Sequence, residues 1–88
     1  MRPREKARAA IVRDWLHKAD TDMSAAEFLL MESAAFPSVA AFHCQQAAEK
    51  YLKAFLTWHG VEFPKTHDIG VLLDLVETVA PELATSLR

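Results

Sequence analysis

The sequence SVAAFHCQQAAEKYLKAFLTWH, which runs from Ser38 to His59, is bounded by Pro37 and Gly60. Proline is favoured in the first turn of a helix, and glycine is favoured just after the last turn. No residue inside the stretch breaks a helix. The pattern therefore predicts one long helix over residues 38–59, around which the neighbouring segments are expected to pack.

This predicted helix has an apolar side and a polar side when its residues are placed about 100° apart around the axis. The apolar side is rich in alanine and is expected to be buried; it contains Ala40, Cys44, Ala47, Ala48, Tyr51, Leu52, Phe55 and Trp58. The polar side is expected to face away from the core; it contains His43, Gln46, Lys50 and Lys53, with Glu49 at its edge. Because these residues are three or four positions apart, their side chains are expected to lie close together in successive turns.

Two interpretations of the polar side are open. In the first, Lys50 and Lys53 bind a phosphate, Gln46 contacts a base or a ribose, and His43 changes its charge near neutral pH. In the second, the polar side is an ordinary solvated helix surface. Glu49 and Lys53 then form a surface pair worth about 0.3–0.5 kcal/mol.

The remaining segments also predict helices. The first is expected from about Arg4 to Glu32, and the short connection over residues 33–37 makes it an antiparallel neighbour of the second. A third helix is expected to begin near His67 or Asp68, with Thr66 as its cap and Asp68 in its first turn. In one interpretation His67 and Asp68 are cap residues only. In the other, His67 adds a hydrogen-bond donor to the polar side, beside Thr57 or Lys53.

The twelve residues HCQQAAEKYLKA, from His43 to Ala54, resemble the signature helix of the HEPN family (higher eukaryotes and prokaryotes nucleotide-binding). The pairs Trp15-Leu16 and Asp22-Met23 resemble the first helix of that family, and Thr66-His67-Asp68-Ile69 resembles the start of its third. The resemblance implies an all-α, up-and-down four-helix-type bundle formed by residues 1–88 as a single domain. It also implies a nucleotide or RNA ligand and, for small prokaryotic members, a separately encoded minimal nucleotidyltransferase as partner, often in a toxin–antitoxin pair. The implied ligand-binding residues are His43, Gln46, Lys50, Lys53 and His67.

The resemblance is incomplete near the end of the chain. Family members carry an Arg-Tyr-Pro-like segment in their last helix, and this segment is not present here. Pro81 is expected to open a fourth helix that is short, so the last helix of the family is short or missing in this chain. The apolar surface left uncovered is expected to favour a homodimer, formed through the alanine-rich and aromatic surfaces of the first two helices.

Composition narrows the possible functions. The 88 residues carry a formal net charge of −2, which argues against a strongly basic nucleic-acid footprint. The one basic cluster, Met1 to Arg8, is interrupted by Glu5 and is expected to be a solvated tail or first turn. The single cysteine, Cys44, excludes an intrachain disulfide and is expected to be a buried, inert thiol. We expect a cytoplasmic protein without a membrane span, cofactor or metal site, because no apolar run, glycine-rich loop or metal-ligand spacing is present.

The resemblance also raises an enzymatic alternative. Many HEPN proteins resemble metal-independent ribonucleases, whose motif is an arginine and a histidine with at least four residues between them on a late helix. Arg13 and His17 come nearest to this motif, but only three residues separate them and they lie on the first predicted helix. The sequence therefore leans away from an enzyme. Two alternatives stay open: a ribonuclease toxin whose catalytic pair lies beyond Arg88, and a dimerisation or interaction module without a ligand.

Overall fold

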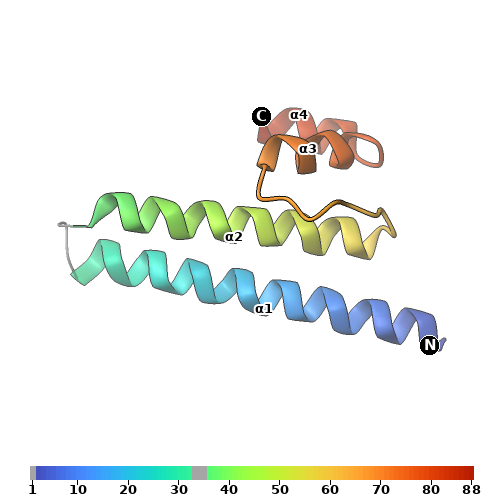
Figure 1. Cartoon of the computed structure of the whole chain (residues 1–88), viewed down its shortest axis with the longest axis horizontal. Coiled ribbons are helices and arrows are strands. Elements are labelled where there is room, and N and C mark those ends of the chain that lie inside the picture. Colours follow the sequence, from blue (N-terminus) through green and yellow to red (C-terminus); the bar gives the residue numbers. More distant parts are fainter. Residues whose placement is uncertain (1, 33–35) are drawn as a thin grey trace.

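The computed structural model describes residues 2–32 and 36–88, and within these ranges it contains four helices and no strand. They are α1 (Pro3–Glu32), α2 (Pro37–Trp58), α3 (Ile69–Glu77) and α4 (Pro81–Leu87) (Figure 1). The predicted all-α class is confirmed, and the predicted helix ends agree to within two residues. Met1 and residues 33–35 of the predicted connection lie outside the described residues.

The molecule has three layers, with α2 in the middle. The long helices α1 and α2 run antiparallel, and α3 packs on the opposite side of α2 together with α4 (Figure 1). The 30 residues of α1 span about 45 Å at the usual helical rise, which accounts for the longest dimension of 47 Å. Because α2 contacts helices on two sides, it has two buried faces.

Alanine residues form the contact between α1 and α2. Ala19 and Ala26 of α1 are buried, and so are Ala40, Ala47 and Ala54 of α2. Within each helix these alanines are seven residues apart, so they lie along one line that can face a neighbouring helix. Their small side chains allow the two backbones to pack closely. We call these five residues the alanine seam.

A second core lies between α2, α3 and α4. It is built from the buried residues Leu56, Leu72, Val76 and Ala84. The chain reaches this core by reversing at Gly60, where φ is +70°, a left-handed value that favours glycine. The Gly60 N–H donates to the Thr57 carbonyl and the Val61 N–H donates to the Leu56 carbonyl, as in a Schellman motif. The reversal sends residues 61–68 back along α2 (Figure 1).

The start of α3 differs from the prediction. Asp68 is the N-cap of the helix instead of a first-turn residue, and its side chain accepts hydrogen bonds from the backbone N–H groups of Gly70 and Val71. Thr66 is not the cap, since its hydroxyl oxygen accepts from the Asp68 N–H one step earlier. A carboxylate binds the exposed N–H groups of a helix start better than a hydroxyl does, which explains the choice of Asp68.

The prediction of which side of α2 is buried is partly wrong. Cys44 is exposed instead of buried, and Tyr51 and Trp58 are 38% and 56% exposed. Conversely, Glu49 and Lys53 are buried, with 2% and 7% exposed. The reason is that α1 covers one side of α2 and residues 61–68 cover another, so the polar edge that carries Glu49 and Lys53 lies inside.

Two further expectations are affected by the fold. The alanine seam is buried within the chain, so these five alanines are not available for contact with a second copy of the chain. No helix in the described ranges is both long and apolar enough to cross a membrane.

The alanine seam predicts a strong dependence on side-chain size. Ala47→Leu is expected to lower the free energy of unfolding by about 1–3 kcal/mol, because overpacking forces the two helices apart. The matched control is Ala48→Leu, one residue further along the same helix at an exposed position. Urea unfolding followed by circular dichroism measures both. Equal stabilities of the two variants would contradict close packing at Ala47.

Candidate functional site

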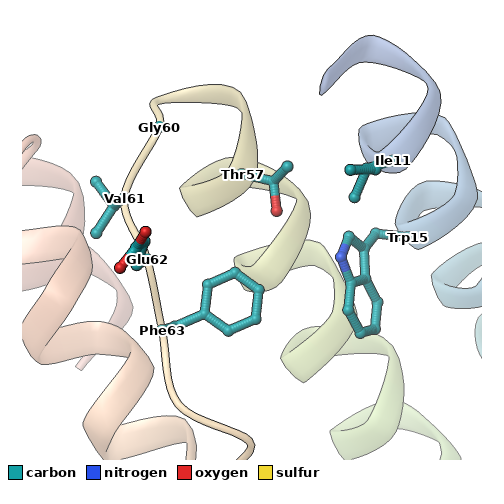
Figure 2. Close-up of a pocket in the computed structure, with 7 residues that line it drawn as sticks. All are labelled: Ile11, Trp15, Thr57, Gly60, Val61, Glu62 and Phe63. Atoms are coloured by element: carbon teal, nitrogen blue, oxygen red, sulfur yellow. The ribbon is translucent and has the colours of Figure 1, made fainter. Parts of the chain in front are cut away.

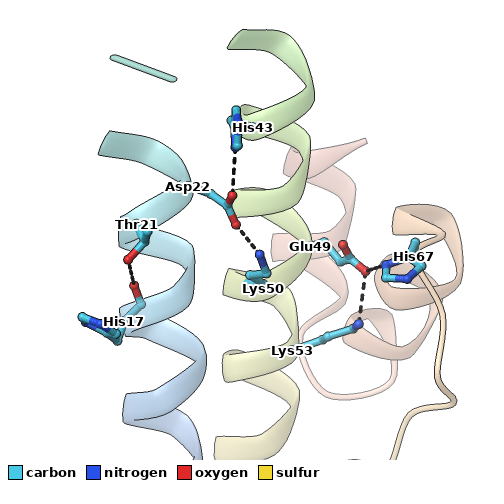
Figure 3. A network of polar contacts seen from close by, with 8 residues as sticks. All are labelled: His17, Thr21, Asp22, His43, Glu49, Lys50, Lys53 and His67. Atoms are coloured by element: carbon cyan, nitrogen blue, oxygen red, sulfur yellow. Dashed lines mark hydrogen bonds and ion pairs between the residues drawn. The ribbon is translucent and has the colours of Figure 1, made fainter. Parts of the chain in front are cut away.

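A carboxylate of α1 holds two basic side chains of α2 (Figure 3). Asp22 Oδ1 lies 3.0 Å from Nδ1 of His43, and Asp22 Oδ2 accepts a hydrogen bond from the ammonium of Lys50. His43 and Lys50 are seven residues apart and therefore share one side of α2. We call Asp22, His43 and Lys50 the Asp22 network.

The Asp22 carboxylate is held in its charged form. Its partial burial raises the pKa, but the hydrogen bonds and charges of Lys50 and His43 outweigh that effect, so the pKa of Asp22 lies below its ordinary value. Asp22 is therefore a fixed anion that positions an ammonium and an imidazole side by side.

A second carboxylate, Glu49, organises the other side of α2 (Figure 3). Glu49 Oε1 accepts a hydrogen bond of 3.1 Å from the Lys53 ammonium and lies 2.6 Å from Nδ1 of His67. The glutamate side chain is 2% exposed, whereas that of His67 is 84% exposed. We call these three residues the Glu49 network. It ties residues 61–68 to the middle of α2, because a buried carboxylate is costly unless it is paired.

The structure places the five predicted site residues in two groups and does not form one open strip. His43 and Lys50 belong to the Asp22 network, Lys53 and His67 belong to the Glu49 network, and Gln46 is half-buried. The expectation that Lys53 faces solvent is wrong. His67 does reach α2, but its partner is Glu49; Thr57 instead donates its hydroxyl to the Lys53 carbonyl.

The acidic partners were not identified as site residues from the sequence. Asp22 lies three residues after Ala19 and four before Ala26, so it falls on the buried face of α1. A carboxylate at such a position requires a cationic partner. From this spacing in the sequence, the Asp22 network could have been predicted.

An aromatic pocket adjoins the Glu49 network (Figure 2). The rings of Trp15 and Phe63 have centroids 6.4 Å apart and planes at 61°. The Lys53 ammonium lies 5.2 Å from the Trp15 centroid and 6.0 Å from the Phe63 centroid. The pocket has a volume of about 460 Å³ and is lined by Ile11, Trp15, Thr57 and residues 60–63. Sequence reasoning missed it because no spacing rule predicts the path of residues 61–68 over α2.

The titratable clusters contain no arrangement typical of a metal centre. In the part of the chain that the structure describes, no group of three histidine, cysteine or acidic side chains gathers at one point. The chemistry that the site offers is hydrogen bonding and charge, supplied by two lysines, two imidazoles and two fixed carboxylates.

The Asp22 network predicts a pH-dependent stability. Asp22→Asn is expected to lower the free energy of unfolding at pH 7 by about 1–3 kcal/mol, because two hydrogen bonds to a charged group are weakened. The pKa of Asp22 is lower in the folded than in the unfolded chain. The stabilisation is therefore complete above the unfolded value, near 3.8, and is lost as the pH falls through the folded value. The difference between wild type and variant should narrow below about pH 4.

Urea unfolding at pH 7, 5 and 3 measures this difference. Asp14→Asn is the matched control, since Asp14 forms an exposed pair with Lys18 on the same helix and its loss is expected to cost less than about 1 kcal/mol. A difference between wild type and Asp22→Asn that stays constant from pH 7 to pH 3 would contradict the charged network.

Comparison with known proteins identifies the family of this chain. The model of the HEPN domain matches residues 12–88, which is most of the chain. No curated protein and no solved structure matches. The matched range includes Trp15, both carboxylate networks and all four helices except the first turns of α1. The chain belongs to the HEPN domain family.

Proposed function

We propose that this HEPN domain is a non-catalytic module that binds a nucleotide, or the phosphates of an RNA, at the Asp22 network, with His43 and Lys50 as the contacts to phosphate and Gln46 on the same helix between them. Membership of a family generally related to nucleotides and RNA supports this function. The observation that carries it is the Asp22 network. Asp22 fixes His43 and Lys50 side by side while 29% and 24% of their side chains stay exposed.

The hydrogen-bonding capacity of Lys50 supports the proposal. An ammonium has three N–H donors, and the Asp22 carboxylate accepts from one of them. The remaining donors, with those of His43, can reach the oxygens of a phosphate. Because Asp22 already positions the ammonium, binding does not have to restrict a freely moving lysine side chain.

Calorimetric titration with adenosine triphosphate, and separately with a single-stranded oligoadenylate, tests the phosphate contact. Lys50→Met is expected to weaken binding roughly tenfold, which corresponds to the loss of about 1.4 kcal/mol. Arg13→Met, on an exposed part of α1, removes the same charge away from the networks and is expected to bind like the wild type. Thermal unfolding of both variants verifies that they fold.

Two results would count against this function. One is the absence of binding to either probe by the wild-type chain. The other is an equal loss of affinity in Lys50→Met and Arg13→Met, which would indicate attraction by overall charge only. An intact dimer without any ligand affinity would instead favour the dimerisation module.

We further propose that the domain forms a homodimer and acts with a separately encoded minimal nucleotidyltransferase. Exposed large apolar side chains support a protein interface. Several belong to the last turns of α1 and the first turns of α2, at the end of the hairpin distant from α3 and α4 (Figure 1); they are Phe28, Leu30, Met31, Phe36, Val39 and Phe42. Concentrations of such residues on a soluble domain are typical of interaction surfaces.

Light scattering coupled to gel filtration tests the assembly. The wild-type chain is expected to elute with the mass of a dimer, and Phe42→Asp is expected to elute as a monomer because a charge enters the apolar contact. Leu87→Asp is the matched control, at a similarly exposed position of α4. A nucleotidyltransferase encoded beside the gene is expected to co-elute with the wild-type domain. A monomeric wild type, or separate elution of the two proteins, would overturn the corresponding part of the proposal.

A further inference from the structure

We propose that the aromatic pocket receives the base of a nucleotide and that Arg8, whose guanidinium lies beside the lining residue Gly60, binds the phosphate. This inference rests on the proposed nucleotide function and assigns a second contact region, separate from the Asp22 network: the pocket and Arg8 bind one nucleotide, and Lys50 and His43 contact another phosphate of a longer ligand.

The two rings provide the surface for a base. Trp15 and Phe63 are half-buried and inclined at 61°, with centroids 6.4 Å apart, so neither ring is stacked on the other. Trp15 turns the nitrogen-bearing edge of its indole toward Phe63 and Thr57 (Figure 2). The rings pack edge to face against each other, and a planar base in the pocket can pack against the side of either ring that faces the pocket and accept a hydrogen bond from the indole N–H. Contacts between bases and aromatic rings tolerate different bases, because every base has a π face.

The cations around the rings leave the entrance available. Lys53 lies at the inner end, where the Glu49 carboxylate holds its ammonium. Lys18 also approaches Trp15, at 5.5 Å from the ring centroid, but it is exposed and held by an exposed pair with Asp14. Displacing it costs little, since such surface pairs contribute less than about 1 kcal/mol.

The size and the polar groups of the pocket suit a nucleoside. Its volume of about 460 Å³ lies within the range usual for small-molecule sites. Thr57 donates its hydroxyl hydrogen to the Lys53 carbonyl, which leaves the hydroxyl oxygen as an acceptor. Glu62 supplies a carboxylate at the side of the pocket (Figure 2), where it can accept from a ribose hydroxyl or an amino group.

Arg8 is placed to bind the phosphate. Its guanidinium lies against Gly60, and the position of a Cβ at Gly60 would be 3.4 Å from the nearest nitrogen. None of the ion pairs within residues 2–32 and 36–88 involves Arg8, whereas Lys50 and Lys53 each pair with a carboxylate. An arginine without a carboxylate partner beside an aromatic pocket can form a bidentate contact with a phosphate.

Fluorescence of Trp15 tests the pocket directly. Trp58→Phe removes the other tryptophan, which is 56% exposed, and leaves Trp15 as the single reporter. Adenosine monophosphate and adenosine are both expected to change the Trp15 emission, and ribose 5-phosphate is not. In the same background Phe63→Leu is expected to weaken adenosine binding roughly tenfold, as is usual when a stacking ring is removed. Circular dichroism verifies that each variant folds.

The phosphate contact has a separate test. Arg8→Gln is expected to reduce the affinity for adenosine monophosphate roughly tenfold, to the value for adenosine, and to leave adenosine binding unchanged. Arg13→Gln is the matched control and should leave both affinities unchanged. If Arg8→Gln loses affinity equally for adenosine monophosphate and for adenosine, the role of Arg8 is overturned.

The outcomes distinguish this inference from the proposed function. One outcome is that calorimetry detects binding of adenosine monophosphate while the Trp15 emission does not change and Phe63→Leu binds adenosine as tightly as its parent. In that case the pocket is not the base site, and the proposed function stands. If the wild-type chain binds neither adenosine monophosphate nor oligoadenylate, both are overturned.

Discussion

The arrangement of this domain depends on one buried negative charge. Glu49 lies in the middle of α2 with 2% of its surface exposed, and an unpaired carboxylate in that position would cost several kcal/mol. The charge is tolerated because Lys53 and His67 both contact the same oxygen. His67 belongs to the segment that leads back along α2, so the pairing determines where that segment lies. The position of Phe63, four residues earlier, follows from the same constraint.

Lys53 connects the two parts of the candidate site. Its ammonium donates to Glu49 and lies within 6.0 Å of both ring centroids of the aromatic pocket. A ligand that moved Lys53 would therefore disturb the contact between Glu49 and residues 61–68. Lys53 is thus the side chain that the aromatic pocket and the Glu49 network share.

The helices could be predicted from the sequence because their signals are local. Pro37, Gly60 and Pro81 mark helix ends, and the apolar spacing of α1 and α2 extends over several turns. The faces of α2 could not be predicted equally well. Helical periodicity assumes one buried side, whereas α2 is covered by α1 on one side and by residues 61–68 and α3 on another. Glu49 and Lys53 were therefore assigned to the surface, and Cys44 to the interior, in both cases wrongly.

The carboxylate partners of the predicted site residues could not be predicted. His43, Lys50, Lys53 and His67 stay predicted site residues, and in the structure each of them pairs with a carboxylate. The pairing of Lys50 with Asp22 joins residues that are 28 positions apart in the sequence. Such a pair depends on the rotation of α1 relative to α2, and this rotation is set by the alanine seam. No periodicity within a single helix contains that information.

The residue at position 60 is restricted by its backbone and not by its surroundings. Gly60 adopts a backbone conformation that other residues rarely tolerate. A Cβ there would meet the guanidinium of Arg8 only at an ordinary van der Waals distance. A larger residue would therefore strain the reversal after α2 even though the space beside it is sufficient, so this exposed position has less freedom to vary than its exposure suggests.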